Sequence, residues 1–167
     1  MLVLGIDPGT AITGYGLVRE ERDGLSLLAC GVIRTPAKEA LPERLKRIYT
    51  ELCDIIRTYR PEAMAVEQIF FSNNARTAFA VGQARGVCLL AGVEGGVAVH
   101  EYTPLQVKQA VVGYGQATKE QVQQMVRMLL ELEAAPQPDD AADAVAIAIC
   151  HHHSARMRDL LRGAPDV

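Results

Sequence analysis

Three segments with strand character, joined by short turns, occupy the first 35 residues of the chain. They cover residues 2–7, 12–19 and 25–35, and each is rich in Val, Ile and Leu. The dipeptide Asp23-Gly24 separates the second segment from the third and is a strong hairpin signal. Since parallel neighbours need a crossover of a dozen or more residues, these short links predict an antiparallel meander.

Helices and short strands alternate in the rest of the chain. Apolar residues spaced by three and four predict helices, and short apolar runs between turn residues predict strands. The predicted order is a helix at 41–59, a strand at 63–67, a helix at 75–93, a strand at 97–102, helices after Pro104 and Thr118, and a helix from about 139 to 156. This order predicts an α/β fold with a mixed five-stranded sheet flanked by helices.

The length of 167 residues is typical of one domain. We expect that domain to span residues 1–160, followed by a frayed tail at 161–167. No apolar run approaches the roughly 20 residues of a membrane span, and the start lacks the basic segment of a signal peptide, so we expect a cytoplasmic protein. The four cysteines lack the spacing of a zinc site or disulfide frame, and we expect them to be small buried apolar residues.

Four carboxylates stand where a predicted strand ends or a predicted helix begins. Asp7 and Glu67 end the first and fourth strands, and ligands of open α/β sheets bind outside the carboxyl ends of strands. Asp140 and Asp143 are three residues apart, so we expect them on one face of the predicted helix, with their Cβ atoms about 5–6 Å apart. Turn formation explains an Asp before Pro-Gly, and helix capping explains one more, but not all four. Carboxylates from three elements suit a hard divalent cation such as Mg²⁺, which keeps waters for a phosphate substrate.

The net charge of −3 argues against a simple nucleic-acid-binding domain, which is usually basic. Five of the 20 acidic residues, however, lie within 131–143. The rest of the chain carries 17 basic and 15 acidic residues. An acidic pocket on a mildly basic body is compatible with a metal-dependent enzyme that acts on a polyanion.

Aromatic and basic residues accompany these carboxylates. Phe70 and Phe71 follow the fourth strand, and we expect one ring in the core and the other in the open. An exposed ring there would stack on an unpaired base, a contact worth about 1–3 kcal/mol. Lysines such as Lys108 and Lys119 usually lie on the solvated surface. Beside an acidic metal site, however, they would neutralise phosphates. Thr118-x-x-Gln121 is a capping box that predicts the start of the helix bearing Lys119.

Two short motifs look like binding sites but lack what such sites need. His151-His-His153 lies on a predicted helix, where consecutive side chains diverge by about 100° and do not bind one ion. We expect one of these rings to be partly buried and two to be solvated. Gly9-x-x-x-x-Gly14 is half of a P-loop, but Tyr15-Gly16 replaces the Lys-Ser/Thr pair that the motif requires.

Six motifs, in chain order, resemble the RuvC family of Holliday junction resolvases. They run from residue 5 to about 150, so the likeness covers nearly the whole chain. The motifs are Gly5-Ile-Asp-Pro-Gly-Thr with Gly14-Tyr-Gly16, Ala65-Val-Glu-Gln68 with Phe70, Gly82-Gln-Ala-Arg-Gly86, Gln106-Val-Lys-Gln109, Val111-Val-Gly-Tyr-Gly115, and Asp140-Ala-Ala-Asp-Ala144 with Ala146-Ile-Ala148.

The resemblance implies a ribonuclease-H-like fold and cleavage of four-way DNA junctions that depends on Mg²⁺ or Mn²⁺, with two ions per active site. It implies a homodimer and the RuvA–RuvB branch-migration complex as partners. The catalytic and metal-binding quartet that it implies is Asp7, Glu67, Asp140 and Asp143, although some relatives have His at the Asp140 position. The DNA-binding set is Phe70, Lys108 and Lys119, to which we add Arg76, where relatives can carry an acidic residue.

The helix at 75–93 is unusually rich in Ala and Gly. Because Gly costs about 1 kcal/mol in a helix interior, we expect close packing to offset it, at or under a twofold interface.

Three alternatives stay open beside this interpretation. A RuvC-like ribosomal-RNA-processing nuclease shares the Asp-x-Gly start, but the later motifs disfavour it. Gly5-Ile-Asp-Pro-Gly-Thr also resembles the first phosphate loop of actin-like and chaperone ATPases, which are longer and have a second such loop. A catalytically inactive binding module is disfavoured by the intact carboxylate quartet.

Overall fold

One five-stranded sheet forms the centre of the molecule. The structure, a computed structural model, describes the backbone of residues 1–68 and 75–163, and their side chains except those of 75–77 and 159–163. The strands are β1 (Leu2–Asp7), β2 (Ile12–Glu20), β3 (Leu25–Arg34), β4 (Ala63–Glu67) and β5 (Ala98–Tyr102), in the spatial order β3-β2-β1-β4-β5. The first three strands are antiparallel, and β1, β4 and β5 run parallel. The mixed five-stranded sheet and the meander are confirmed.

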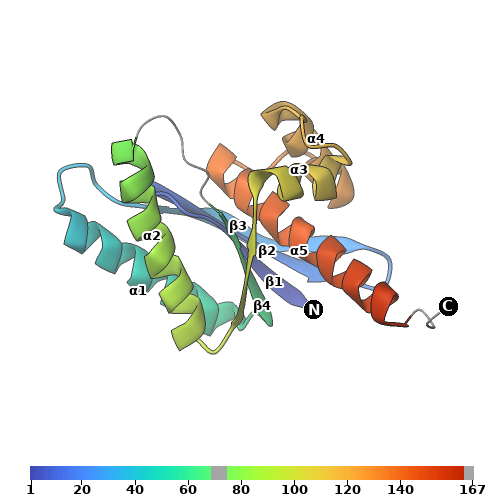
Figure 1. Ribbon diagram of the computed structural model, residues 1–167, viewed down its shortest axis with the longest axis horizontal. Helices are drawn as coiled ribbons and strands as arrows, with labels where there is room; N and C mark the ends of the chain where they lie inside the picture. Colours follow the sequence, from blue (N-terminus) through green and yellow to red (C-terminus); the bar gives the residue numbers. More distant parts are fainter. Residues whose placement is uncertain (69–74, 164–167) are drawn as a thin grey trace.

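Five helices cover the two faces of this sheet. They are α1 (Leu41–Tyr59), α2 (Ala75–Glu94), α3 (Pro104–Val112), α4 (Lys119–Leu129) and α5 (Asp139–Gly163). Figure 1 shows α1 and α2 on one side of the sheet and α3, α4 and α5 on the other. Because both faces are covered, the central strands have side chains in two separate cores: Val3 packs towards α5, and Leu4 packs towards α1 and α2. This explains why the strands read as continuous apolar runs.

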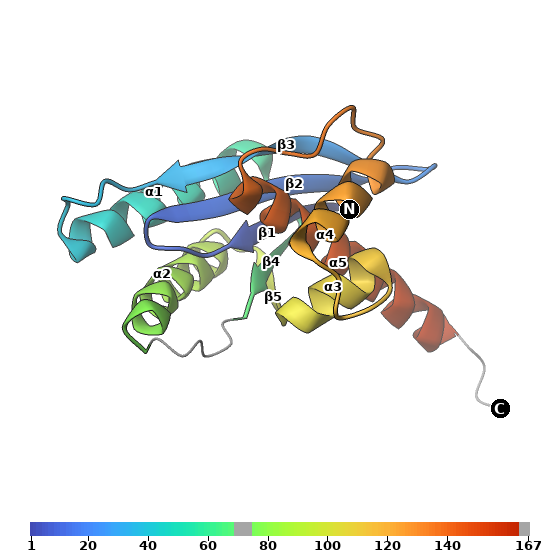
Figure 2. The same cartoon turned by 90° about the horizontal axis from the view of Figure 1, so that it is seen from above.

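Three glycines allow α5 to lie directly on the sheet. A Cβ atom added at Gly5 of β1 would collide with the carbonyl of Ala144, and one at Gly14 of β2 with the carbonyl of Asp140. Gly16, two residues further along β2 on the same face, meets the same helix. Glycine in a strand interior often marks such a close backbone approach. The first turn of α5 is thereby held beside the carboxyl end of β1 (Figure 2).

The last helix is longer than predicted, because it continues to Gly163 and does not end near Arg156. The expected exposure of the three histidines is also wrong. His151 and His152 are buried, with 2% and 4% of their surface exposed, and His153 is half-buried. Helical periodicity does not predict this burial, because it does not show that α5 is covered on two sides. The helix lies between the sheet and the α3–α4 pair.

The buried histidines hydrogen-bond to the surrounding elements. His151 Nδ1 lies 2.9 Å from the hydroxyl of Tyr102, and His152 Nε2 lies 3.0 Å from the carbonyl oxygen of Val18. Such a bond offsets part of the cost of burying a polar ring. Nδ1 of His152 is buried without a hydrogen-bond partner among the described residues. The rings are therefore part of the packing between α5 and the sheet.

The four cysteines are free thiols. Cys88 and Cys150 are buried as predicted, whereas the prediction is wrong for Cys30 and Cys53, which are only half-buried. Among the described helices, none is both long and apolar enough to cross a membrane.

Candidate active site

Three elements bring the four predicted carboxylates to one end of the sheet. Asp7 ends β1 and Glu67 ends β4, which are parallel neighbours paired up to Ile6 and Val66, so the two carboxyl ends meet. The close contact of α5 with Gly5 and Gly14 places the first turns of this helix over the same end of the sheet. These turns carry Asp140 and Asp143.

Asp7 is the carboxylate most affected by this crowding. Burial, followed by the negative charges of Glu67, Asp143 and Asp140, raises its pKa to about 8, and only Lys119 acts in the opposite direction. Both burial and like charges disfavour the ionised form of a carboxyl group. A strongly perturbed pKa of this origin is common at functional sites.

The pKa of Glu67 is raised for similar reasons but by less. Burial and then the charge of Asp143 raise the pKa of Glu67 to about 7, and Lys108 and Lys119 lower it. Burial also raises the pKa of Asp143, although the hydrogen bond and charge of Lys119 oppose this. The ionised forms of these carboxylates therefore call for additional positive charge.

Lys119 provides part of that charge. Its ammonium lies 2.9 Å from Oδ2 of Asp143 and 3.5 Å from Oδ2 of Asp139. The hydrogen bond to Asp143 is the main reason why its pKa is raised. The predicted capping box is confirmed and holds the lysine in place: Thr118 Oγ1 accepts from the Gln121 backbone, and Gln121 Oε1 accepts from the Thr118 backbone.

A small pocket joins both lysines to two of the carboxylates. It has a volume of about 200 Å³. Its polar lining comes from Glu67, Lys108, Lys119 and Asp143, and its apolar lining from Pro104, Val107, Val122 and Ala146. The predicted acidic and basic residues therefore face one shared space.

The donor chemistry of the carboxylate quartet fits a hard divalent cation. Every side-chain donor is a carboxylate oxygen, and burial followed by neighbouring carboxylates raises the pKa values of Asp7 and Glu67, so a bound cation would favour their ionised forms. Within residues 1–68 and 75–163, however, no three His, Cys, Asp or Glu side chains close around a single point as metal ligands do. Asp143 instead points its Oδ2 at Lys119.

The structure does not describe the side chains of the other two predicted DNA-binding residues. Phe70 lies outside the described residues, and so does the side chain of Arg76. Their contacts with DNA stay predictions.

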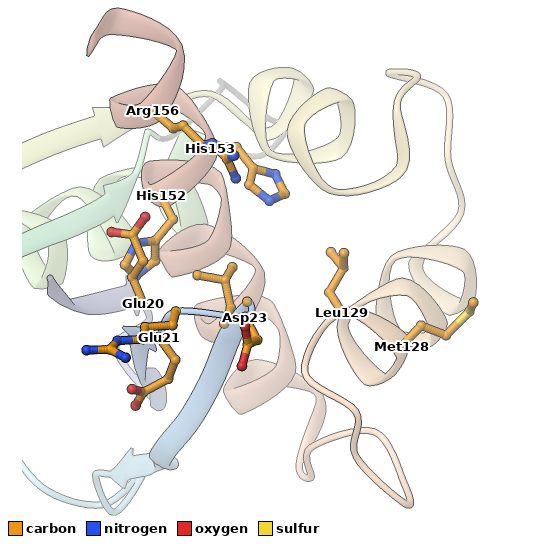
Figure 3. Close-up of a pocket in the computed structure, with 11 residues that line it drawn as sticks. Glu20, Glu21, Asp23, Met128, Leu129, His152, His153 and Arg156 are labelled. Atoms are coloured by element: carbon orange, nitrogen blue, oxygen red, sulfur yellow. The ribbon is translucent and has the colours of Figure 1, made fainter. Parts of the chain in front are cut away.

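A larger pocket, of about 760 Å³, lies beside the middle of α5 (Figure 3). It is lined by the β2–β3 hairpin over Glu20–Leu25, by Met128 and Leu129 of α4, and by His152, His153 and Arg156 of α5. Asp140 and His152 are twelve positions apart, which corresponds to about 18 Å along the helix. None of the predicted site residues that the structure describes lines this pocket, so it is separate from the carboxylate cluster.

Sequence reasoning missed two features that build the site. Gly14 and Gly16 belong to the P-loop-like segment and to a family motif, but glycines at alternate strand positions also signal a close backbone approach. A second capping box, at Thr103 and Gln106, starts α3 and so orients Lys108. Its Thr-x-x-Gln pattern is readable in the sequence.

Comparisons with known proteins agree on one family. The family model described as "Crossover junction endodeoxyribonuclease RuvC" matches residues 3–151. A protein of that name from Heliobacterium modesticaldum is 61% identical over 154 residues, which cover 92% of this chain and 95% of that protein. Its counterpart from Alkaliphilus metalliredigens is 52% identical over 162 residues, covering 97% and 99%.

Solved structures show the same likeness. The structure of Thermus thermophilus RuvC in complex with Holliday junction substrate matches with a TM-score of 0.89 and 44% identity, covering 95% of this chain and 96% of that chain. The yeast mitochondrial Holliday junction resolvase Ydc2 matches with a TM-score of 0.64 at 14% identity, over 96% of this chain and 84% of that chain, which shows a shared fold. With a family match over most of its length and relatives more than half identical to it, the chain belongs to the RuvC family of crossover junction endodeoxyribonucleases.

Proposed function

We propose that this protein is a structure-selective endodeoxyribonuclease that resolves Holliday junctions by symmetric, metal-dependent hydrolysis of phosphodiester bonds, in DNA recombination and repair. The observation that carries the proposal is the meeting of Asp7, Glu67, Asp140 and Asp143 at one end of the sheet. It occurs in a chain whose family relative from Thermus thermophilus has been solved with a Holliday junction substrate.

The carboxylate quartet is the proposed metal-binding set, with Asp7 as the shared ligand. Two divalent cations, Mg²⁺ or Mn²⁺, would supply an activated water and stabilise the leaving oxygen when bound. Two such charges would change the formal net charge from −3 to about +1, which favours contact with a polyanion. The RuvA–RuvB complex as a partner, a cytoplasmic location and a single domain over 1–160 are proposals that rest on the sequence alone.

The protein's own residues hold the substrate phosphate in this scheme. Lys108 and Lys119 line the pocket beside Glu67 and Asp143, where an ammonium group meets a phosphate oxygen as a point charge. Phe70 is proposed to stack on an unpaired base, and Arg76 to contact the DNA backbone.

We also propose that α2 forms the twofold interface of a homodimer. Phe79, Leu90 and Val93 are exposed by 70%, 52% and 67%. They share one helix face with Gly86, where an added Cβ would touch nothing within 4 Å. The opposite face, by contrast, packs on the protein's own sheet through Ala84, Cys88, Ala91 and Gly92. A twofold axis would relate two active sites, as two symmetric cuts require.

The dimer is tested by changing Gly86 to Leu and measuring the mass in solution. A bulky side chain on the open face should shift the protein towards monomer, while the same change at the exposed Gln109 of α3 should not. A Gly86→Leu protein of unchanged dimer mass would place the interface elsewhere.

Cleavage is tested with a synthetic four-way junction, a linear duplex of the same sequence and a structured RNA. We expect paired, symmetric cuts in the junction that require Mg²⁺ or Mn²⁺, with little cutting of the duplex or the RNA. Preferred cutting of RNA, or cutting that survives removal of divalent cations, would contradict the proposal.

A further inference from the structure

A continuous chain of hydrogen bonds runs through the turn that follows Asp7. Nε of Arg44 in α1 donates to Oγ1 of Thr35 at 2.8 Å. The Thr35 hydroxyl donates to the backbone oxygen of Thr10 at 2.5 Å, and the Thr10 hydroxyl donates to the backbone oxygen of Ala80 at 2.8 Å. The chain therefore connects α1, the end of β3, the turn and the second turn of α2.

Thr10 and Thr35 are buried, with 9% and 7% of their surface exposed. Leaving a buried hydroxyl without its partner destabilises the folded protein, so these bonds hold their elements in fixed positions. Other bonds act on the turn as well: Thr13 Oγ1 donates to the Gly9 carbonyl at 2.7 Å, and the Thr35 backbone donates to the Ala11 carbonyl at 3.0 Å, which ties the turn to the end of β3. The bond from Thr10 to Ala80 differs because it ties the turn to α2.

That element is the helix with the open apolar face. Ala80 directly follows the exposed Phe79, and Thr10 stands three residues after Asp7. The Thr10 hydroxyl thus lies between the helix proposed to pair two protomers and the strand end that bears the central carboxylate. We infer that Thr10 is a positioning residue, whose hydroxyl holds the 8–11 turn against α2 and so sets the placement of Asp7. This inference rests on the proposed junction cleavage and deepens it.

The test compares Thr10→Val, which keeps the shape but removes the hydroxyl, with Thr10→Ser, which keeps the hydroxyl. We expect Thr10→Val to lower kcat on the junction about 10–100-fold, because a small misplacement of a reacting group has effects of this size. Its KM and junction Kd should stay within about twofold of wild type, and its mass in solution should remain that of the dimer. Thr10→Ser should restore most of kcat, and Thr50→Val, at an exposed position of α1, should behave as wild type.

A second measurement does not depend on activity. Amide hydrogen exchange in Thr10→Val should be faster in the segment 8–13 and unchanged in residues 3–6 of β1. If Thr10→Val does not fold, Thr10→Cys against Thr10→Ser gives the same comparison, since a thiol is a much weaker donor in a similar space.

The outcomes separate the two proposals. A wild-type protein that does not cut the junction would overturn the proposed function. A wild-type protein that cuts, together with a folded Thr10→Val protein of unchanged kcat, would overturn the positioning role alone. The role would equally be overturned if Thr10→Ser lost as much kcat as Thr10→Val, or if Thr10→Val lost junction binding to the same extent as kcat.

Discussion

The first turns and the middle of α5 both lie among buried titratable side chains, with opposite consequences for charge. Around the first turns, burial and then the charges of neighbouring carboxylates raise the pKa values of Asp7 and Glu67 to about 8 and 7. In the middle of the helix, burial and then the charge of His100 lower the pKa of His151 to about 4, and its ring hydrogen-bonds to Tyr102. The histidine region is therefore neutral and packed, whereas the carboxylate region concentrates negative charge. Uncompensated charge of this kind distinguishes a site from a core.

The Asp7→Asn substitution should have the largest effect and tests whether the carboxylate region is a catalytic site. We expect junction cleavage to fall at least about 10³-fold, because the change removes the central carboxylate of the proposed metal set. Junction binding should survive or improve, since repulsion of phosphates decreases. Cleavage and binding are measured on the same labelled junction, and circular dichroism confirms folding. Loss of binding in a folded Asp7→Asn protein would make Asp7 a structural residue.

Stability as a function of pH tests the raised pKa directly. Between about pH 4 and 8 the folded protein keeps a proton on Asp7 that the unfolded chain has lost. The metal-free protein should therefore lose stability as pH rises through this window, by up to about 1.4 kcal/mol per pH unit for such a group. Urea unfolding at several pH values should show that Asp7→Asn reduces this loss and that Mg²⁺ reduces it in the wild type alone. Equal slopes in both metal-free proteins would contradict the charge crowding.

The stability contributed by His151, in the histidine region, should depend on pH in the opposite sense. The folded-state pKa of His151 lies below that of the unfolded chain, so the unfolded state binds the extra proton as pH falls from about 6.5 to 4. Stability should therefore rise with pH across this window and then level off with respect to this group. His151→Phe should flatten that acid-side rise in the same urea series and leave the slope between pH 7 and 8 unchanged. A His151→Phe protein with altered metal-dependent cleavage would show that the histidine region and the carboxylate region are functionally coupled.

Lys119→Ala should have the smallest effect. Its removal should lower the salt slope of junction binding by about one unit, as expected for one phosphate contact. It should also raise the pKa of Asp143 further, because the lysine now opposes that rise. Lys46→Ala, an exposed lysine of α1 on the other face of the sheet, serves as the control for total charge. A salt slope that is equal in both variants would remove Lys119 from the DNA surface.

Local sequence patterns were enough to predict the order of the elements and the position of each carboxylate within them. Asp7 and Glu67 stand at strand ends whichever strands are neighbours, and Asp140 and Asp143 share a helix face because of the helical repeat. The capping box at Thr118 was also readable, because its hydrogen bonds lie within four residues. These features depend on periodicity and short-range bonding, which the chain carries in its own order of residues.

Tertiary structure alone decided which of these features meet. The order β3-β2-β1-β4-β5 makes the ends of β1 and β4 neighbours, and backbone contact at Gly5 and Gly14 lowers α5 onto them. The pairing of Lys119 with Asp143, and the burial of the histidines, follow from how α4 and α5 pack together and against the sheet. Some of these contacts join residues that are more than a hundred positions apart in the chain. A local sequence pattern does not predict that such distant residues meet. The sequence by itself therefore determined the chemistry available to this protein, and packing determined its placement.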